Sequence, residues 1–477
     1  MVITKAWYAA VIMEWTSHTL ARHESESQKG PMTPVAHRVS ARALPWIVAL
    51  CVVTACSSSD STSVQTPAPP TTALACPGGP APVPDVLISE TPNPPFTIRH
   101  EPVLPLLPKA GATVTDPTFG TTILRLTDGA DGNTDMQVQY SYWPAFNGNC
   151  TFIHVKGTYA GSSRSVFLSF DPATSTAGPP IVLRTPPPQG FLLERSDMIW
   201  SGISPDLIYG HNDVHKLWAY DVASKQYAMI KDFSGSVLLN GDLSQMSKSL
   251  DDQVFAFTLT NANGEPAGYF AWHRGRDQIL VRAEVTNLDE LQVDKSGRYL
   301  IVVYGDGHDE IFDLAPSTPT LIDRLIQADG FAFVHRDTGM GTLFHDYFPT
   351  RSLVFGRIET PRVFQQMIPG HWSYETQDDH FSMQADNELW ALSSRFSTDG
   401  GPVLNPFDNE IVQVATDGSD RVRRIAHHRS LVTVYEDQPK ASISRDGRYV
   451  AFTSNWGVVN GRRDVYIVVN IPPAPTS

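Results

Sequence analysis

The chain has little positive charge, few cysteines and none of the short motifs that mark several common enzyme classes. Its 477 residues carry a net charge of −14, and no basic cluster offsets this balance. A general nucleic-acid binder needs a basic footprint, so nucleic acid is excluded as a partner. The sequence contains no Gly-x-Ser-x-Gly elbow, no glycine-rich phosphate loop and no Cys-x-x-Cys pair. The nucleophile, phosphate-binding and redox chemistry of those motifs is therefore not indicated.

Long apolar segments are also lacking. The stretch ALPWIVALCVVTAC (43–56) follows basic residues at 37–42, and it is too short and wrongly flanked for a spanning helix. It has the basic and apolar regions of a signal peptide and ends in Val-Thr-Ala-Cys at 53–56. This ending resembles the lipobox of bacterial lipoproteins, which implies that Cys56 is lipidated after cleavage. An ordinary secretory signal with a chance cysteine is the alternative.

This interpretation divides the N-terminal part of the chain. Residues 1–31 fit no targeting role, and we expect them to be a non-native extension upstream of a start at Met32. Residues 32–56 form the predicted lipoprotein signal peptide. The Ser/Thr/Pro-rich residues 57–95 cannot bury a core and are predicted to be a linker. Residues 96–120, with four prolines, are predicted to pack irregularly against the main domain. The expected location is the cell envelope, anchored to a membrane by lipid on the periplasmic or extracellular side, with the outer membrane as one destination.

Only two of the four cysteines, Cys76 and Cys150, would remain after cleavage at Cys56. The cell envelope permits disulfides, so a Cys76–Cys150 bridge would attach the linker to the first repeat. Two unpaired thiols are the other possibility, because the sequence does not fix the distance between them.

The main domain contains a hairpin that recurs seven times. Its clearest copy is SISRDGRYVAFTSN (442–455), in which an alternating strand meets an Asp-Gly turn and a second strand follows. Repetition at about 40–60 residues is typical of propeller blades. The seven copies lie at 140–155, 196–210, 244–258, 291–305, 330–345, 380–394 and 442–455.

These repeats predict an all-β fold, a seven-bladed β-propeller of four-stranded blades spanning 121–471. Two further strands follow each hairpin, except that the last blade runs out of chain before its fourth strand. TTILRLTD (121–128) has the character of that missing strand. Closing the ring with it would remove an exposed sheet edge, so we predict that residues 121–128 complete the last blade. Six or eight blades are alternatives, because the first and fifth copies match the pattern poorly.

The predicted topology places residues on two faces. We call the face with the Asp-Gly turns the turn face, and the face with the remaining loops the loop face. Eight of the fifteen histidines map to the loop face, where imidazole would be available as a metal ligand or base. The alternative is that long loops simply collect polar residues. The segment GHWSYETQDDHFS (370–382) adds three candidate ligand-binding residues, which are Trp372, Tyr374 and Asp378.

One copy, SISRDGRYVAFTSNWG with RRDVYIV, resembles the repeats of TolB-type (WD40-like) propellers. A second, distant resemblance is to the oligogalacturonate lyase family, whose propeller binds manganese through histidines and a Gln-x-x-His-x-His segment. Gln377-Asp378-Asp379-His380 matches the start of that segment, but Ser382 replaces its last histidine. The resemblance implies a divalent metal such as manganese, held by residues drawn from His371, Gln377, His380, His345 and His308.

If the lyase resemblance extends to activity, the reaction would be β-elimination on a uronic-acid sugar. A base would take the proton beside the carboxylate, and the candidates are His211, His215 and His428. Arg195 or Arg429 would hold the carboxylate, and Tyr435 would protonate the leaving oxygen.

Two functions follow from the sequence. The first is a lipid-anchored envelope propeller that binds a glycan, a small ligand or a protein on its loop face. The alternative is a metal-assisted polysaccharide lyase.

Overall fold

The computed structural model describes residues 76, 78–92, 95–101, 103–159, 162–182, 198–212, 215–235, 241–330, 335–372, 377–398, 403 and 405–473. All of them fall within one unit of the chain, Val64–Ser477. The predicted signal peptide with Cys56, and the candidates Arg195 and Tyr374, lie outside the described residues, so these remain predictions. In the described ranges, no helix has the length and apolar character needed to cross a membrane.

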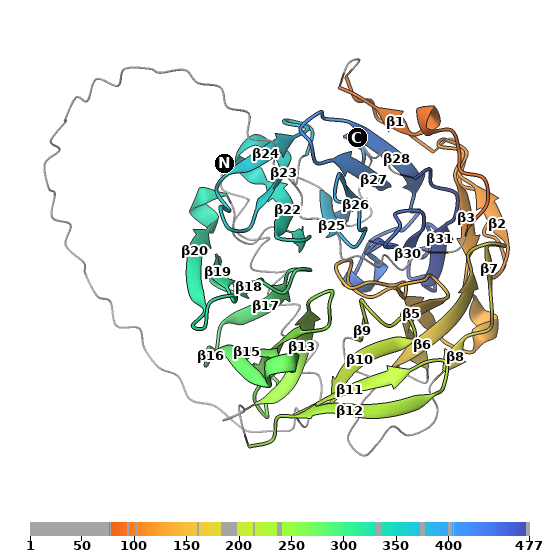
Figure 1. Ribbon diagram of the computed structural model, residues 1–477. Helices are drawn as coiled ribbons and strands as arrows, with labels where there is room; N and C mark the ends of the chain where they lie inside the picture. The colour runs from red at the N-terminus through yellow and green to blue at the C-terminus, as the bar shows by residue number, and fades with distance from the viewer. Residues whose placement is uncertain are drawn as a thin grey trace, which may run out of the picture. The chain divides into compact units, whose positions relative to one another are not determined.

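Seven antiparallel sheets surround a central axis, as predicted (Figure 1). We number them as blades 1 to 7 along the chain. Blade 1 contains β4 (Asp135–Gln137), β5 (Phe152–Tyr159), β6 (Ser162–Asp171), β7 (Thr176–Ala177) and β8 (Ile181–Val182). Blade 2 contains β9 (Ile199–Trp200), β10 (Leu207–Asn212), β11 (Lys216–Asp221) and β12 (Gln226–Asp232). Blade 3 contains β13 (Asp242–Lys248), β14 (Val254–Thr260), β15 (Pro266–His273) and β16 (Gln278–Ala283).

The remaining blades follow the same order from the axis outward. Blade 4 contains β17 (Leu288–Val293), β18 (Tyr299–Tyr304), β19 (His308–Asp313) and β20 (Thr320–Ile326). Blade 5 contains β21 (Arg336–Thr338), β22 (Thr342–Tyr347), β23 (Ser352–Arg357) and β24 (Phe364–Met367). Blade 6 contains β25 (Gln377–Ser382), β26 (Trp390–Ser397), β27 (Glu410–Ala415), β28 (Val422–His427) and β1 (Ser89–Glu90). Blade 7 contains β29 (Ser442–Ile443), β30 (Val450–Ser454), β31 (Asp464–Val468), β3 (Thr122–Arg125) and β2 (Thr113–Thr115).

Helical structure in the described chain is limited to short 3-10 turns. They are η1 (Asp85–Leu87), η2 (Gly129–Asp131), η3 (Arg274–Arg276), η4 (Gln327–Asp329), η5 (Phe348–Thr350) and η7 (Tyr435–Asp437).

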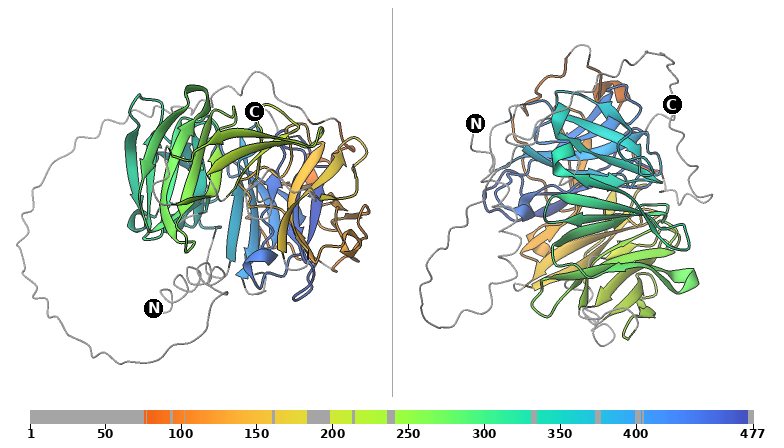
Figure 2. Two further views of the ribbon diagram at one scale, coloured as in Figure 1. Left: turned by 90° about the horizontal axis from the view of Figure 1, so that it is seen from below. Right: turned by 90° about the vertical axis from the view of Figure 1, so that its left-hand side faces the viewer.

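The core lies between neighbouring blades, and strand β18 shows why. All six of its residues are buried, because a blade is covered on both faces. Side chains alternate along a strand. Leu300 and Val302 therefore pack in the cluster shared with blade 3, whereas Tyr299 and Ile301 pack in the cluster that reaches Leu343 of blade 5. The side views show these sheets standing side by side (Figure 2).

The Asp-Gly hairpin forms as the sequence indicates. In blade 7, Gly447 has a φ of 73°, which a residue without a Cβ adopts readily. The Ser444 backbone N–H donates to Tyr449 O at 2.9 Å, and the Ser444 hydroxyl donates to Asp446 Oδ1 at 2.7 Å. The same geometry turns the first strand into the second at the turn face.

The ring is closed by the N-terminal strand, which confirms the predicted role of residues 121–128. Strand β3 pairs antiparallel with β31, with Ile123 opposite Val468 and Arg125 opposite Tyr466. The Arg125 guanidinium also donates to Asp464 Oδ2 at 2.6 Å. The blade thus joins both ends of the domain.

The chain before β3 follows the outer edge of blades 6 and 7. Within the predicted linker, Ser89 and Glu90 form β1 and pair with Arg423 and Val422 of β28. Further along, the Phe96 ring packs 5.0 Å from the Phe407 ring. The structure therefore places residues 85–90 on blade 6, ahead of the segment predicted to pack irregularly.

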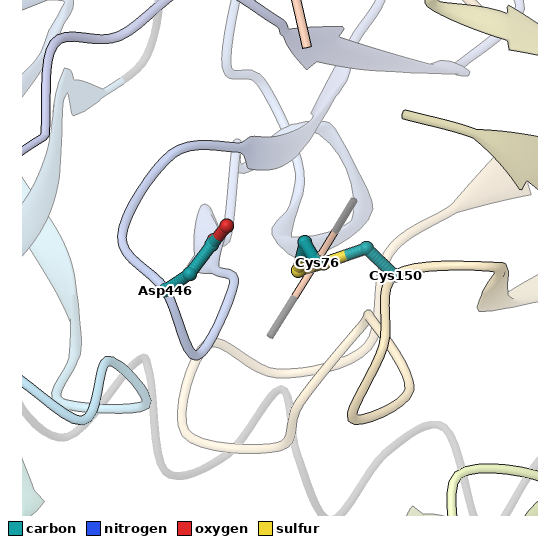
Figure 3. A group of neighbouring side chains, drawn as sticks. All are labelled: Cys76, Cys150 and Asp446. Atoms are coloured by element: carbon teal, nitrogen blue, oxygen red, sulfur yellow. A yellow bond between two sulfur atoms is a disulfide. The ribbon is translucent and has the colours of Figure 1, made fainter. Parts of the chain in front are cut away.

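A disulfide joins this outer segment to blade 1. Cys76 and Cys150 are bonded, with a Cα–Cα distance of 5.2 Å, and Asp446 of the blade 7 turn lies beside them (Figure 3). Cys150 lies in the turn before β5. The sequence was compatible with either a disulfide or two unpaired thiols, and the structure contains the disulfide.

The bridge spans 74 residues of sequence, so its removal is expected to release substantial chain entropy in the unfolded state. The double variant Cys76→Ser/Cys150→Ser should lose about 4 kcal/mol of unfolding free energy in urea denaturation. Reduced wild-type protein should match the variant. Two titratable thiols in unreduced protein, or equal stability of the oxidised and reduced forms, would contradict the bridge.

Candidate functional site

Polar side chains from every blade except the second meet near the axis, on the loop-face half of the described structure. We call this set the axial cluster. Its members are Tyr140, Tyr142, Gln245, Glu290, His335, Arg336, Asp378, His380 and Gln438. Each lies on the innermost strand of its blade or within five residues of it, which is why residues far apart in sequence meet here.

One part of the cluster is a hydrogen-bonded ion-pair network. The Tyr142 hydroxyl donates to Glu290 Oε2 at 2.7 Å and accepts from Gln245 Nε2 at 3.1 Å. Arg336 donates to Glu290 Oε1 at 3.2 Å and to Asp309 Oδ2 at 3.4 Å. These bonds link blades 1, 3, 4 and 5 across the axis.

Burial sets the protonation of this network. Desolvation raises the pKa of Asp309 to about 6, although the Arg336 guanidinium opposes the shift. The pKa of Tyr142 is raised well above its usual value by burial and by Glu290. The network therefore holds more carboxyl groups than its single arginine neutralises.

His335 lies between two carboxylates. Its Nδ1 is 3.0 Å from Asp378 Oδ1 and 3.5 Å from Asp379 Oδ1. Burial alone would lower the pKa of His335, but the Asp378 carboxylate raises it well above the usual value. The second oxygen of Asp379 accepts from Trp372 Nε1 at 2.6 Å, which fixes that carboxylate.

His380 is a neutral imidazole with one nitrogen unused. Its Nε2 donates to Gln438 Oε1 at 2.8 Å, so the lone pair lies on Nδ1, which has no hydrogen-bond partner. Burial, with the nearby His335 charge, lowers the pKa of His380 to about 3. The His380 ring centroid lies 4.8 Å from that of Tyr140 and 5.2 Å from that of His335. A buried bare nitrogen can accept a proton or bind a metal.

These donors fit a divalent cation such as manganese. Ligand atoms of His335, Asp378 and Asp379 all lie within 4.8 Å of one another. The His380 ring, whose Nδ1 has no hydrogen-bond partner, has its centroid 5.2 Å from that of His335. Carboxylate with imidazole suits manganese. Binding would require His335 to lose its proton, as metal binding to histidine generally does.

The turn-face half of the axis is different. It contains a cavity of about 60 Å³ between the innermost strands. The lining cations Lys248, Lys295 and Arg445 are paired with Asp252, Glu388 and Asp386 at 2.5, 3.4 and 3.0 Å. Because these charges are already neutralised, the loop-face half is the better candidate for a charged ligand.

Most of the predicted metal ligands have partners elsewhere in the fold. Gln377 shares β25 with His380, but its Oε1 accepts from Asn405 Nδ2 at 3.1 Å. His371 packs against Phe96, with ring centroids 5.3 Å apart. Two others are equally engaged: His345 Nδ1 donates to Asp346 O at 2.5 Å, and His308 stacks on Tyr304 at 4.2 Å and pairs with Asp306.

The predicted ligand-binding residues are divided. Asp378 lies in the axial cluster. Trp372 is fully buried beneath the loops, with the Arg395 guanidinium 4.6 Å from its ring centroid, so it offers no surface for a sugar.

The predicted bases and the predicted arginine are also held by the fold. Both nitrogens of His428 are bonded, since Nε2 donates to Arg395 O at 3.0 Å and Nδ1 accepts from Ser430 N at 2.9 Å. His215 Nε2 donates to Gly241 O at 2.9 Å. His211 packs edge-on against Phe257, with ring centroids 6.0 Å apart, and Arg429 donates to Asp116 Oδ2 at 2.9 Å. Tyr435 is 41% exposed, and its ring centroid lies 3.5 Å from Lys440 Nζ.

Several members of the cluster were not predicted from the sequence, namely Tyr140, Tyr142, Glu290, His335 and Arg336. His335 and Arg336 fall within the hairpin 330–345, where they were interpreted as strand residues. Both residues lie where the innermost strand of blade 5 begins at the loop face. His380 lies on the equivalent strand of blade 6, so comparing equivalent positions between blades would have identified them as candidates.

The raised pKa of Asp309 predicts a pH-dependent stability. The native state holds this proton more tightly than the unfolded chain does, so the group's contribution falls as pH rises from about 4 through about 6. Asp309→Asn should therefore gain about 2 kcal/mol relative to wild type between about pH 4.5 and 7.5 in urea unfolding. A pH-independent difference between the two proteins would refute the assignment.

Comparisons with known proteins show the fold. No protein-family model matches the chain, and no curated protein matches it. Among solved structures, it is similar to an oligogalacturonate lyase in complex with manganese, with a TM-score of 0.56 and 13% identity over 77% of this chain and 97% of that chain. It is also similar to an oligogalacturonate lyase from Vibrio parahaemolyticus, with a TM-score of 0.50 and 11% identity over 75% of this chain and 95% of that one. At these identities the likeness shows that this chain shares their fold.

Proposed function

We propose that this protein binds an acidic carbohydrate on its loop face, with a divalent cation at the axial cluster. The observation that carries the proposal is the bare, buried Nδ1 of His380 beside His335, Asp378 and Asp379. A buried polar atom without a partner is unfavourable, and a ligand that uses it removes that cost. The predicted lipid anchor at Cys56 would place this site at the cell envelope.

The cation-binding residues have distinct tasks. Asp378 and Asp379 would supply negative charge, and the Trp372 bond to Asp379 would keep that carboxylate in place. His335 and His380 would supply imidazole nitrogens, with Gln438 fixing the tautomer of His380. When bound, the cation would neutralise the carboxylate of a uronic-acid sugar. This explains how so acidic a protein would hold an acidic ligand.

Titration calorimetry tests both the cation and the sugar. Chelator-treated protein is titrated first with manganese and then with oligogalacturonide, and each binding affinity is measured. Loss of even an outer-shell partner costs ~10–100-fold in metal affinity, so His380→Ala should weaken manganese binding by about 100-fold. His215→Ala is the matched control and should bind as wild type does. Equal manganese affinity in the His380→Ala variant, or no manganese binding by wild type, would refute the site.

A second candidate function is a polysaccharide lyase, favoured by the fold shared with an oligogalacturonate lyase that binds manganese. β-Elimination needs a base and an acid. His380 Nδ1 is a neutral base, and the pKa of Tyr140 is raised well above its usual value by burial, so its phenol stays protonated. His380 would take the C5 proton as the C4–O bond breaks and the C4–C5 double bond forms, and Tyr140 would protonate the leaving oxygen. In this function His335, Asp378 and Asp379 alone would hold the cation.

The lyase function predicts an absorbance increase from unsaturated uronate when wild type acts on oligogalacturonide. Removing a general acid costs ~10²–10⁴-fold, so Tyr140→Phe should lower kcat by that factor with KM nearly unchanged. If wild type binds the sugar without any absorbance change, the lyase function is excluded and the binding function stands.

A further inference from the structure

Lys440 is a buried lysine that lacks an acidic partner. It lies in the loop leading to β29, has a φ of 45°, and is 4% exposed. Its Nζ lies 3.5 Å from the centroid of the Tyr435 ring. In the described part of the chain, Lys440 makes no side-chain hydrogen bond and no ion pair. Buried lysines without a partner are rare, because an uncompensated charge in a low-dielectric site is costly.

The neighbouring charges do not compensate Lys440. Asp437 is committed elsewhere, since it accepts from Arg463 Nε at 2.8 Å and from the Thr433 hydroxyl at 2.8 Å. Glu436 attracts the lysine only from beyond ion-pair distance, and Lys156 and Arg463 repel it. Burial accordingly lowers the pKa of Lys440 to about 7. The site thus has a cationic group that an incoming anion would stabilise.

Lys440 is close to the axial cluster. Gln438, two residues earlier, holds His380 Nε2 at 2.8 Å. The Lys440 charge also acts on His380, and the Tyr435 phenol beneath it acts on Tyr140. The Tyr435 ring that packs on this lysine is 41% exposed, so an incoming ligand reaches that ring directly.

We propose that Lys440 is a ligand-binding residue that receives the carboxylate of an acidic sugar at the axial cluster, with the Tyr435 ring packed against its ammonium group. The inference rests on the proposed function and specifies its ligand, a free uronate rather than a neutral or esterified sugar. The cation of His335, Asp378 and Asp379 and the ammonium of Lys440 would then contact two acidic groups of one oligosaccharide.

Binding of trigalacturonate and of its methyl ester tests this specificity. Lys440→Met keeps the apolar stem and removes the charge, and it should weaken trigalacturonate binding by at least tenfold while leaving the weaker binding of the ester unchanged. Lys440→Arg should recover part of the affinity. Lys109→Met, at an exposed lysine, is the control and should match wild type. Urea unfolding checks that each variant is folded.

A second measurement separates this inference from the proposed function. The Lys440 amine is titrated by NMR with labelled lysine, assigned with Lys440→Arg, with and without galacturonate monomer. We expect saturating galacturonate to raise its pKa by about one unit, because an adjacent carboxylate favours the ammonium.

Unchanged trigalacturonate affinity in Lys440→Met overturns the role of Lys440 and leaves the proposed function standing. A raised pKa without trigalacturonate binding by wild type overturns the proposed function and keeps the carboxylate site. If wild type shows neither trigalacturonate binding nor a raised Lys440 pKa, both the proposed function and the role of Lys440 are overturned.

Discussion

The pairing of β3 with β31 is the interaction on which the rest of this structure depends. It joins residues 122–125 to residues 464–468, so that blade 7 contains both ends of the domain. Without it, blade 7 would expose an unpaired edge, and the chain that leads from β3 into blade 1 would not be anchored in blade 7. The axial cluster draws on both of these blades, through Tyr140 and Gln438. Closure of the ring is therefore also a condition for the site.

The chain before β3 supports this closure through ion pairs with blades 6 and 7, and it has no hydrophobic cluster of its own among the described residues. Asp116 accepts from Arg429 at 2.9 Å, and its pKa is held at about 2, because the His427 and Arg429 partners outweigh the effect of burial. Arg429, which the sequence predicts to hold a carboxylate, instead binds the N-terminal chain to blades 6 and 7 together with His427. This structural task explains why a histidine-bearing face need not be a functional one throughout.

The sequence predicted the blades and the closing strand because both depend on local patterns: alternation along a strand, Asp-Gly turns and an edge that must be paired. It predicted the site less well. Asp378 and His380 were found from a short motif, but His335 and Lys440 were missed because their importance comes from contacts across the axis. Trp372 and His428 were candidates that the fold buries, since a sequence does not show which loop residues point inward. Whether such a residue belongs to the site depends on its contacts with other blades, and a local sequence pattern does not show those contacts.

We propose that the loop-face half of the axis, and not the other acidic clusters, is a cation site for ligand binding. Glu101, Asp116 and His427 form a competing cluster of metal-ligand type, but Arg429 already pairs with its carboxylates. Anomalous diffraction at the manganese edge, from crystals soaked in manganese, distinguishes the two directly. We expect a peak within bonding distance of His380 Nδ1, beside His335 and Asp378. No peak there, or a peak only at Glu101, Asp116 and His427, would contradict it.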